Sequence, residues 1–201
     1  ADVCCQTGLT QKIVNRRIAD GTKNLPKEPA MTEDEALRAL RTGMEAVEAI
    51  KRCGYDIFGV GEMGIGNTTT SAAVLAALTH APAQAVTGRG GGLTDAAFEK
   101  KKRVIDRALA LHRPDPADPV GVLAAVGGLD LAALTGAFLG RAPNHVPAMV
   151  DGHISIVAAM PAVRLCPAAV ESLFLRTAPY VIVYLIVSPV LCPYPYLPVL
   201  L

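Results

Sequence analysis

The sequence predicts an α/β protein whose parallel sheet is covered by helices on both faces, a Rossmann-like, doubly wound arrangement. Strand-like and helix-like segments alternate along the chain, and loops rich in glycine follow the strand-like segments. With 201 residues, 51% of them hydrophobic, the chain is long enough to bury a core. We expect one α/β domain over residues 1–168, followed by an irregular, apolar and proline-rich C-terminal tail over residues 169–201.

Charge, cysteine and histidine content narrow the possible functions. Lysine and arginine total 19 against 18 acidic residues, so we expect no nucleic-acid partner and no attraction to an anionic membrane. The five cysteines form no CxxC pair and the first fifteen residues lack a secretory signal, which together favour a reducing, cytoplasmic location. The four histidines form no HExxH motif, and we expect neither a metal ion nor another cofactor.

The first element after the N-terminal segment is a helix that begins near Glu33. Thr32 and Glu35 have the spacing of a capping box, in which a hydroxyl and a carboxylate satisfy backbone amides at a helix start. Apolar residues then recur at three- and four-residue steps until Gly54. The stripe that we expect against the core consists of Leu37, Leu40, Met44, Val47 and Ile50.

The chain then repeats the order strand, glycine loop and helix. The pattern predicts strands at residues 55–60 and 85–87, glycine loops at 61–66 and 88–92, and helices at 67–79 and 95–113. Thr94 is the expected N-cap of the second of these helices, and Pro114 ends it.

The next segment predicts two short helices, a strand and a longer helix. The short helices cover residues 120–126 and 131–139, and each is expected to end at a glycine in the left-handed conformation. A strand at 146–150 precedes Asp151, Gly152 and a helix through Arg164. Because the carboxyl ends of parallel strands meet at one edge of a sheet, we expect the three glycine-bearing loops to gather there.

The C-terminal tail contains five prolines after residue 178. Residues 178–201 are apolar and long enough to cross a membrane, but prolines remove backbone hydrogen bonds that lipid cannot replace. The composition favours a short buried strand and an irregular tail over a membrane span.

The segment most indicative of chemistry is Gly-Val-Gly-Glu-Met-Gly-Ile-Gly-Asn-Thr-Thr-Thr at residues 59–70. Glycines let backbone amides approach a phosphate, and a helix that starts near Asn67 adds its positive end. The alternative is a tight strand-to-helix turn that binds nothing. A dinucleotide fingerprint fails because no acidic residue follows at the required distance, and a P-loop fails because Asn67 replaces its lysine.

These residues resemble the nicotinate-nucleotide:dimethylbenzimidazole phosphoribosyltransferase family of cobalamin biosynthesis. The match at residues 61–69 is nearly letter for letter, and it covers about residues 2–168. Residues 17–31 resemble the segment before the family's long helix. Residues 88–93, Gly-Arg-Gly-Gly-Gly-Leu, resemble its second glycine loop, and residues 150–152 resemble a later strand end. The domain over residues 1–168 would then be a nucleotide-binding, phosphoribosyltransferase-like domain that is incomplete.

The resemblance implies a pentosyltransferase that converts nicotinate mononucleotide and 5,6-dimethylbenzimidazole into α-ribazole 5'-phosphate and nicotinate, and it implies a homodimer. The substrate-binding residues carried over from the family are Gly61, Gly64, Ile65, Gly66, Asn67, Thr68, Gly88, Arg89, Gly90, Gly92, Lys101 and Asp151. From the residues alone, Asp151 could equally form an Asx turn with Gly152, and the lysines at 100 and 102 are expected on a solvated helix face.

Glu62 is the candidate catalytic carboxylate, as a secondary base or an acceptor for a ribose hydroxyl; a loop-closing acceptor is its alternative role. The family's principal base is a glutamate in a Glu-Gly-Thr-Gly-like stretch, which this sequence does not contain. Gly91 also stands where the family usually has threonine. The second hypothesis is therefore a noncatalytic nucleotide-binding remnant or fragment without the general base.

Overall fold

A computed structural model describes residues 2–7, 10–15, 21–171 and 173–176 of the chain. Strands β3 (Phe58–Val60), β4 (Ala148–Asp151) and β5 (Leu173–Arg176) form a parallel sheet in the order β3-β4-β5. Strands β1 (Asp2–Thr7) and β2 (Thr10–Asn15) form a separate antiparallel hairpin. The predicted α/β class with a parallel sheet is confirmed.

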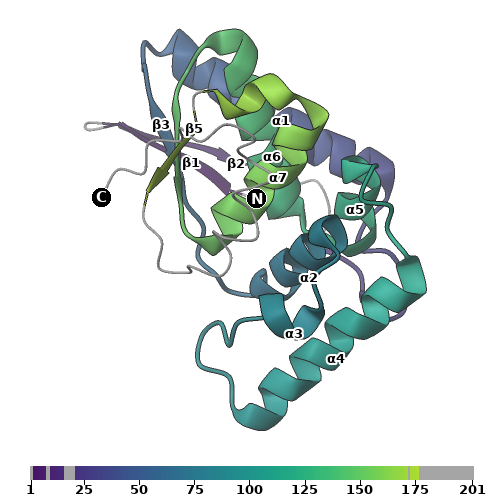
Figure 1. The fold of residues 1–201 in the computed structure, drawn as a ribbon. Helices are drawn as coiled ribbons and strands as arrows, with labels where there is room; N and C mark the ends of the chain where they lie inside the picture. The colour runs from purple at the N-terminus through teal and green to yellow at the C-terminus, as the bar shows by residue number, and fades with distance from the viewer. Residues whose placement is uncertain (1, 8–9, 16–20, 172, 177–201) are drawn as a thin grey trace.

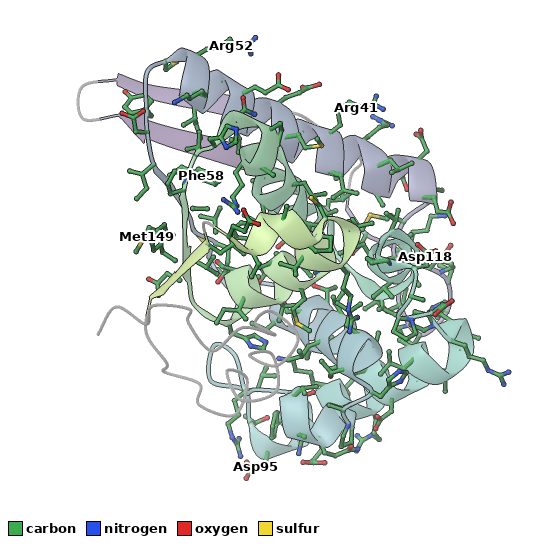
Figure 2. All side chains as sticks on the ribbon, turned by 45° about the horizontal axis from the view of Figure 1, so that its top comes forward. Arg41, Arg52, Phe58, Asp95, Asp118 and Met149 are labelled. Atoms are coloured by element: carbon green, nitrogen blue, oxygen red, sulfur yellow. The ribbon has the colours of Figure 1, made fainter. Side chains whose placement is uncertain are left out.

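Helices make up most of the described chain. They are α1 (Glu33–Arg52), α2 (Thr68–Thr79), α3 (Ala83–Val86), α4 (Asp95–His112), α5 (Pro119–Val126), α6 (Leu129–Asn144), α7 (His153–Leu165) and the 3-10 helix η1 (Pro167–Val170). In Figure 1, helices α1, α6 and α7 lie beside the three parallel strands, and α2 to α5 form the other part of the molecule. Figure 2 shows Arg52 at one end of the molecule and Asp95 at the other.

Helix α1 begins and ends as its sequence predicts. Thr32 Oγ1 accepts a hydrogen bond from Glu35 N, and the Glu35 carboxylate accepts one from Thr32 N, so the capping box is confirmed. Arg41 and Arg52 extend from its outer side into solvent (Figure 2). The apolar stripe is only partly right, because Leu40 and Val47 are buried but Leu37 is 47% exposed.

Small residues, rather than a full stripe of large ones, hold α1 against α6. A Cβ added to Gly43 would lie 1.9 Å from Ala133 O, and one added to Gly136 would lie 1.9 Å from Leu40 O. The two backbones therefore approach each other too closely for any side chain at these positions. Leucines spaced for a helix face do not reveal that the contact is made by the glycines and alanines between them.

Two sequence predictions about helix ends are wrong. Gly127 ends α5 with φ −86° and is not left-handed. Helix α6 does not stop near residue 139 but continues to Asn144, where His145 at φ 51° forms the left-handed cap. Gly140 lies inside this helix. A Cβ at this position would come within 2.7 Å of Met44 Cα of α1. Its glycine serves close helix packing instead of a chain reversal.

The predicted strand at residues 85–87 is also wrong, because Ala83–Val86 form the short helix α3. Pro82 precedes it with φ −61°, a value that suits the residue before a helix start. Ala83 and Val86, three residues apart, are both buried. A run of three residues is too short for its period to separate a strand from a helical turn.

Strand β5 of the parallel sheet lies past residue 168, the expected end of the α/β domain. Strand β5 pairs with β4, with Leu173 opposite Ala148, and Leu173 is 3% exposed. Residues 177–201, which include the segment considered as a membrane span, lie outside the described residues. Within the described part of the chain, no helix combines the length and apolar character that a membrane crossing requires.

Candidate functional site

A buried lysine joins the two glycine loops. Lys101, in α4, is 7% exposed, and its Nζ donates hydrogen bonds to Thr68 Oγ1 at 2.9 Å and to Gly88 O at 2.8 Å. Gly90 lies against the same group, because a Cβ there would be 3.0 Å from Thr68 Oγ1 and 3.8 Å from Lys101 Nζ. The first turn of α2 and the loop before α4 thus meet at one ammonium group, and its burial lowers the pKa of Lys101.

The corner between β4 and α7 adds a histidine to this cluster. His153 is the first residue of α7, directly after Asp151 and Gly152. Burial, and then the positive charge of Lys101, lower the pKa of His153 from 6.5 to about 4. Because β3 and β4 are parallel neighbours, the turn after β4 lies at the same carboxyl edge of the sheet as the first glycine loop, and Lys101 ties the second glycine loop to the helix that follows the first. Asp151 ends β4 and is exposed.

The first glycine loop is closed by a second polar cluster. Glu62 Oε2 accepts hydrogen bonds from Gly64 N and, at 3.1 Å, from Asn67 Nδ2. Asn67 Nδ2 also donates to Asp130 Oδ2 at 2.7 Å. Asp130 is the second residue of α6, so this cluster ties the loop to a helix far away in the sequence.

The amino end of α2 is free of acidic residues in its first turn, and the Asn67 side chain makes no capping hydrogen bond. Helix starts carry backbone N–H groups without partners inside the helix and a partial positive charge. Beside the carboxylates of Glu62 and Asp130, this helix start and the ammonium group of Lys101 supply the donors and positive charge that a phosphate needs.

Some of the glycines that are predicted to bind the substrate use their backbone amides within their own loops. Gly64 N donates to the Glu62 carboxylate, and Gly92 N donates to Gly90 O at 2.9 Å, so both amides are used within their own loops. Gly66 and Gly90, at φ 82° and 61°, are the predicted amide donors that have no such internal bond among the described residues. Both need the left-handed conformation that glycine adopts without strain.

Arg89, which is predicted to bind the substrate, makes its contacts within and just after the second loop. Its guanidinium lies 2.5 Å from Asp95 Oδ1, donates to Leu93 O at 3.1 Å and lies 4.9 Å from the centre of the Phe98 ring. Ile65 is 81% exposed at the tip of the first loop. Gly61 is exposed beside Glu62. In the part of the chain that the structure describes, no three His, Cys, Asp or Glu side chains group as metal ligands.

Sequence reasoning missed two members of this region. His153 belongs to no histidine motif, although its position after a strand end and a glycine indicates the site. Asp130 follows Gly127, Gly128 and Leu129 at a helix start, and nothing local relates it to a loop 63 residues earlier.

Glycine loops at the carboxyl edge of a parallel sheet, with a lysine joining them, define an α/β protein of the class that binds its ligand beyond the strand ends. A sequence model of the phosphoribosyltransferase family matches residues 1–177. The chain belongs to this family.

Named relatives and solved structures agree with this assignment. The nicotinate-nucleotide–dimethylbenzimidazole phosphoribosyltransferase of Clostridium perfringens is 50% identical over 83% of this chain and 46% of its own length. The protein of that name from Syntrophobacter fumaroxidans is 51% identical over 81% and 46%. The crystal structure of CobT from Thermus thermophilus superposes with a TM-score of 0.76 at 38% identity, covering 81% of this chain and 50% of that one. The chain spans about half the length of the curated relatives it matches.

Proposed function

We propose that this chain forms the nucleotide-binding part of an enzyme that transfers the phosphoribosyl group of nicotinate mononucleotide to 5,6-dimethylbenzimidazole. The products are α-ribazole 5'-phosphate and nicotinate, in the synthesis of the lower ligand of cobalamin. The observation that carries the proposal is the hydrogen bonding of Lys101 Nζ to both glycine-loop segments. The names of the relatives support the substrates.

The nucleotide phosphate binds where the two loops meet. An ammonium group has three N–H donors, and Thr68 and Gly88 occupy two of those of Lys101. The third N–H, the amides of Gly66 and Gly90 and the first turn of α2 supply donors and positive charge for one phosphoryl group. No metal ion is needed to neutralise it.

The ribose and the two bases lie toward the exposed tip of the first loop. Nucleophilic attack by the unprotonated ring nitrogen of the benzimidazole at the anomeric carbon expels nicotinate with inversion, and the other ring nitrogen loses its proton to a base. Glu62 accepts a ribose hydroxyl or assists this proton transfer as the secondary carboxylate. Ile65 offers an apolar surface to an aromatic ring, and Asp151 completes the edge of the site. The principal base is a glutamate that the described residues do not provide.

Calorimetric titration with nicotinate mononucleotide tests the proposal. We predict saturable binding by the wild-type chain and a loss of affinity of about tenfold or more in Lys101→Met, because a hydrogen bond to a charged group contributes roughly 1.5–3 kcal/mol. Lys100→Met is the matched control, because Lys100 is the exposed neighbour of Lys101 in the same helix. This variant should keep the wild-type affinity. Equal affinities of the two variants would contradict the proposed phosphate site.

A turnover assay separates catalysis from binding alone. The protein is incubated with nicotinate mononucleotide and dimethylbenzimidazole, and nicotinate release is followed by chromatography. Release that falls about tenfold in Glu62→Gln supports catalysis with Glu62 as a participant. Saturable binding without any release supports the second candidate, a nucleotide-binding remnant that lacks its general base.

We also propose a cytoplasmic homodimer with small-molecule substrates and without a nucleic-acid partner. The near-balanced charge supports the absence of a nucleic-acid partner, and the free thiols of Cys53 and Cys166 support the cytoplasmic location. The resemblance to the family supports the homodimer. Light scattering should give twice the chain mass of 21.0 kDa, and a stable monomer at micromolar concentration would exclude the dimer.

A further inference from the structure

The amide nitrogen of Asn67 lies between two carboxylates from different parts of the chain. It donates to Glu62 Oε2 at 3.1 Å and to Asp130 Oδ2 at 2.7 Å. A side-chain amide nitrogen has two hydrogens, and an ionised carboxylate is an acceptor only. The two carboxylates therefore use both hydrogens of Asn67 Nδ2. They hold the side-chain amide with its nitrogen, and not its oxygen, turned toward them.

Asp130 reaches Asn67 because residue 128, two positions before it, is a glycine and has no side chain. A Cβ at Gly128 would come 2.4 Å from Asp130 Oδ1 and 3.5 Å from Thr70 Oγ1. A side chain at position 128 would thus displace the carboxylate from the start of α2. The start of α6 is built to bring this carboxylate to the glycine loop.

Asn67 links Asp130 to the candidate catalytic carboxylate. Glu62 is exposed, and Asn67 is the side chain that holds its Oε2 besides the amide of Gly64. Without Asp130 the Asn67 amide can rotate by half a turn, and its Oδ1 would then face the carboxylate oxygen. Two acceptors repel each other, so Glu62 would leave the position that closes the loop.

We propose that Asp130 is a positioning residue that acts through Asn67 to hold the Glu62 carboxylate and the loop at residues 61–67 ready for the nucleotide. This role rests on the proposed function, because it assigns Asp130 to the same site. Asp130 also lies in the first turn of α6, where any acid stabilises the helix. The test has to distinguish these two roles.

NMR of the Asn67 side-chain amide tests the link without a ligand. Asp130→Ala should shift both side-chain amide protons of Asn67 and speed their exchange with water, and Asp130→Asn, which keeps a neutral acceptor, should shift them less. Asp118→Asn is the matched control, because Asp118 also accepts a hydrogen bond at a helix start, from Gly121 N, but does not contact Asn67. Its Asn67 resonances should stay at their wild-type positions.

Unchanged Asn67 amide resonances in a folded Asp130→Asn or Asp130→Ala protein would overturn the proposal. A purely helix-stabilising role predicts equal losses of thermal stability in Asp130→Asn and Asp118→Asn and no specific shift at Asn67, and this result would also overturn it.

Mononucleotide titration then tests the consequence for the site. Asp130→Ala should weaken binding or slow turnover by about tenfold in the wild-type background and by less than about twofold in the Glu62→Gln background, because residues that act as a unit are not additive. Equal losses in the two backgrounds would contradict an action through Glu62. If the wild-type chain binds no mononucleotide, the proposed function fails, while the Asn67 resonances still decide whether Asp130 positions the loop.

Discussion

A charged ammonium group and a neutral imidazole share the centre of the candidate site. Lys101 keeps hydrogen-bond acceptors in Thr68 and Gly88, whereas the positive charge of Lys101 adds to the effect of burial in disfavouring the charged form of His153. At neutral pH the imidazole of His153 is therefore uncharged. A phosphate that binds there meets one fixed cation.

The lowered pKa of His153 predicts a pH dependence of folding. Its folded-state pKa of about 4 lies below the ordinary value of 6.5, so the unfolded chain binds more protons between these values. The contribution to stability is complete above about pH 6.5 and is lost as the pH falls toward 4. In urea denaturation, His153→Asn should lose less stability than the wild type over this range.

His80→Asn is the control for this measurement. His80 caps α2 at φ 56°, a conformation that asparagine tolerates, and it is exposed. Its stability should fall with pH as in the wild type. A wild-type slope in His153→Asn would show that His153 does not titrate with a lowered pKa.

Helices α1 and α6 are held together by close backbone contact. Gly43 meets Ala133, Gly136 meets Leu40, and Gly140 meets Met44. This packing fixes the start of α6, from which Asp130 reaches Asn67. The helix pair therefore supports the loop of the candidate site as well as the core.

Gly136→Ala should lower the free energy of unfolding by roughly 2 kcal/mol, since overpacking costs about 1–3 kcal/mol and more where backbone is struck. This loss exceeds the gain of about 0.5–1 kcal/mol that alanine brings to a helix interior. Gly59→Ala in β3 is the control, because its Cβ would meet only Met149 Cβ at 3.9 Å and leave stability nearly unchanged. Urea denaturation of both variants measures the difference, and a stabilised Gly136→Ala would refute the close contact.

Features that depend on a few neighbouring residues were predicted better than features that depend on contacts between residues distant in the sequence. The capping box at Thr32 and the cap at Thr94 depend on a few neighbouring residues, and both were predicted correctly. The prediction that Gly140 ends a helix is wrong because its packing partner, Met44, is distant in sequence. In the site, the glycine loops and Lys101 follow from local pattern and resemblance, whereas Asp130 depends on tertiary packing that no sequence period encodes.

The parallel sheet joins segments that are far apart in the sequence. β3, β4 and β5 are neighbours although about ninety residues separate the first from the second. Phe58 and Met149 lie on adjacent strands of this sheet (Figure 2). The apolar composition after residue 168 did not fix the bounds of β5, because a buried parallel strand and an irregular apolar segment have similar compositions.

Leu173→Ala tests whether β5 is part of the domain core. Leu173 is 3% exposed, and truncation of a buried leucine costs about 2–5 kcal/mol. Leu165→Ala is the control, since Leu165 is 40% exposed at the end of α7 and should cost much less. If both variants lost only a small and equal part of the free energy of unfolding in urea denaturation, β5 would lie outside the unit that unfolds cooperatively.

We propose that the molecule as a whole supports one phosphate site between two glycine loops. A crystal structure with nicotinate mononucleotide bound would show whether this site exists. We predict phosphate oxygens within hydrogen-bond distance of Lys101 Nζ and of the amides of Gly66 and Gly90, with Glu62 near the ribose. A nucleotide bound elsewhere, with Lys101 bonded to Thr68 and Gly88 alone, would contradict this account.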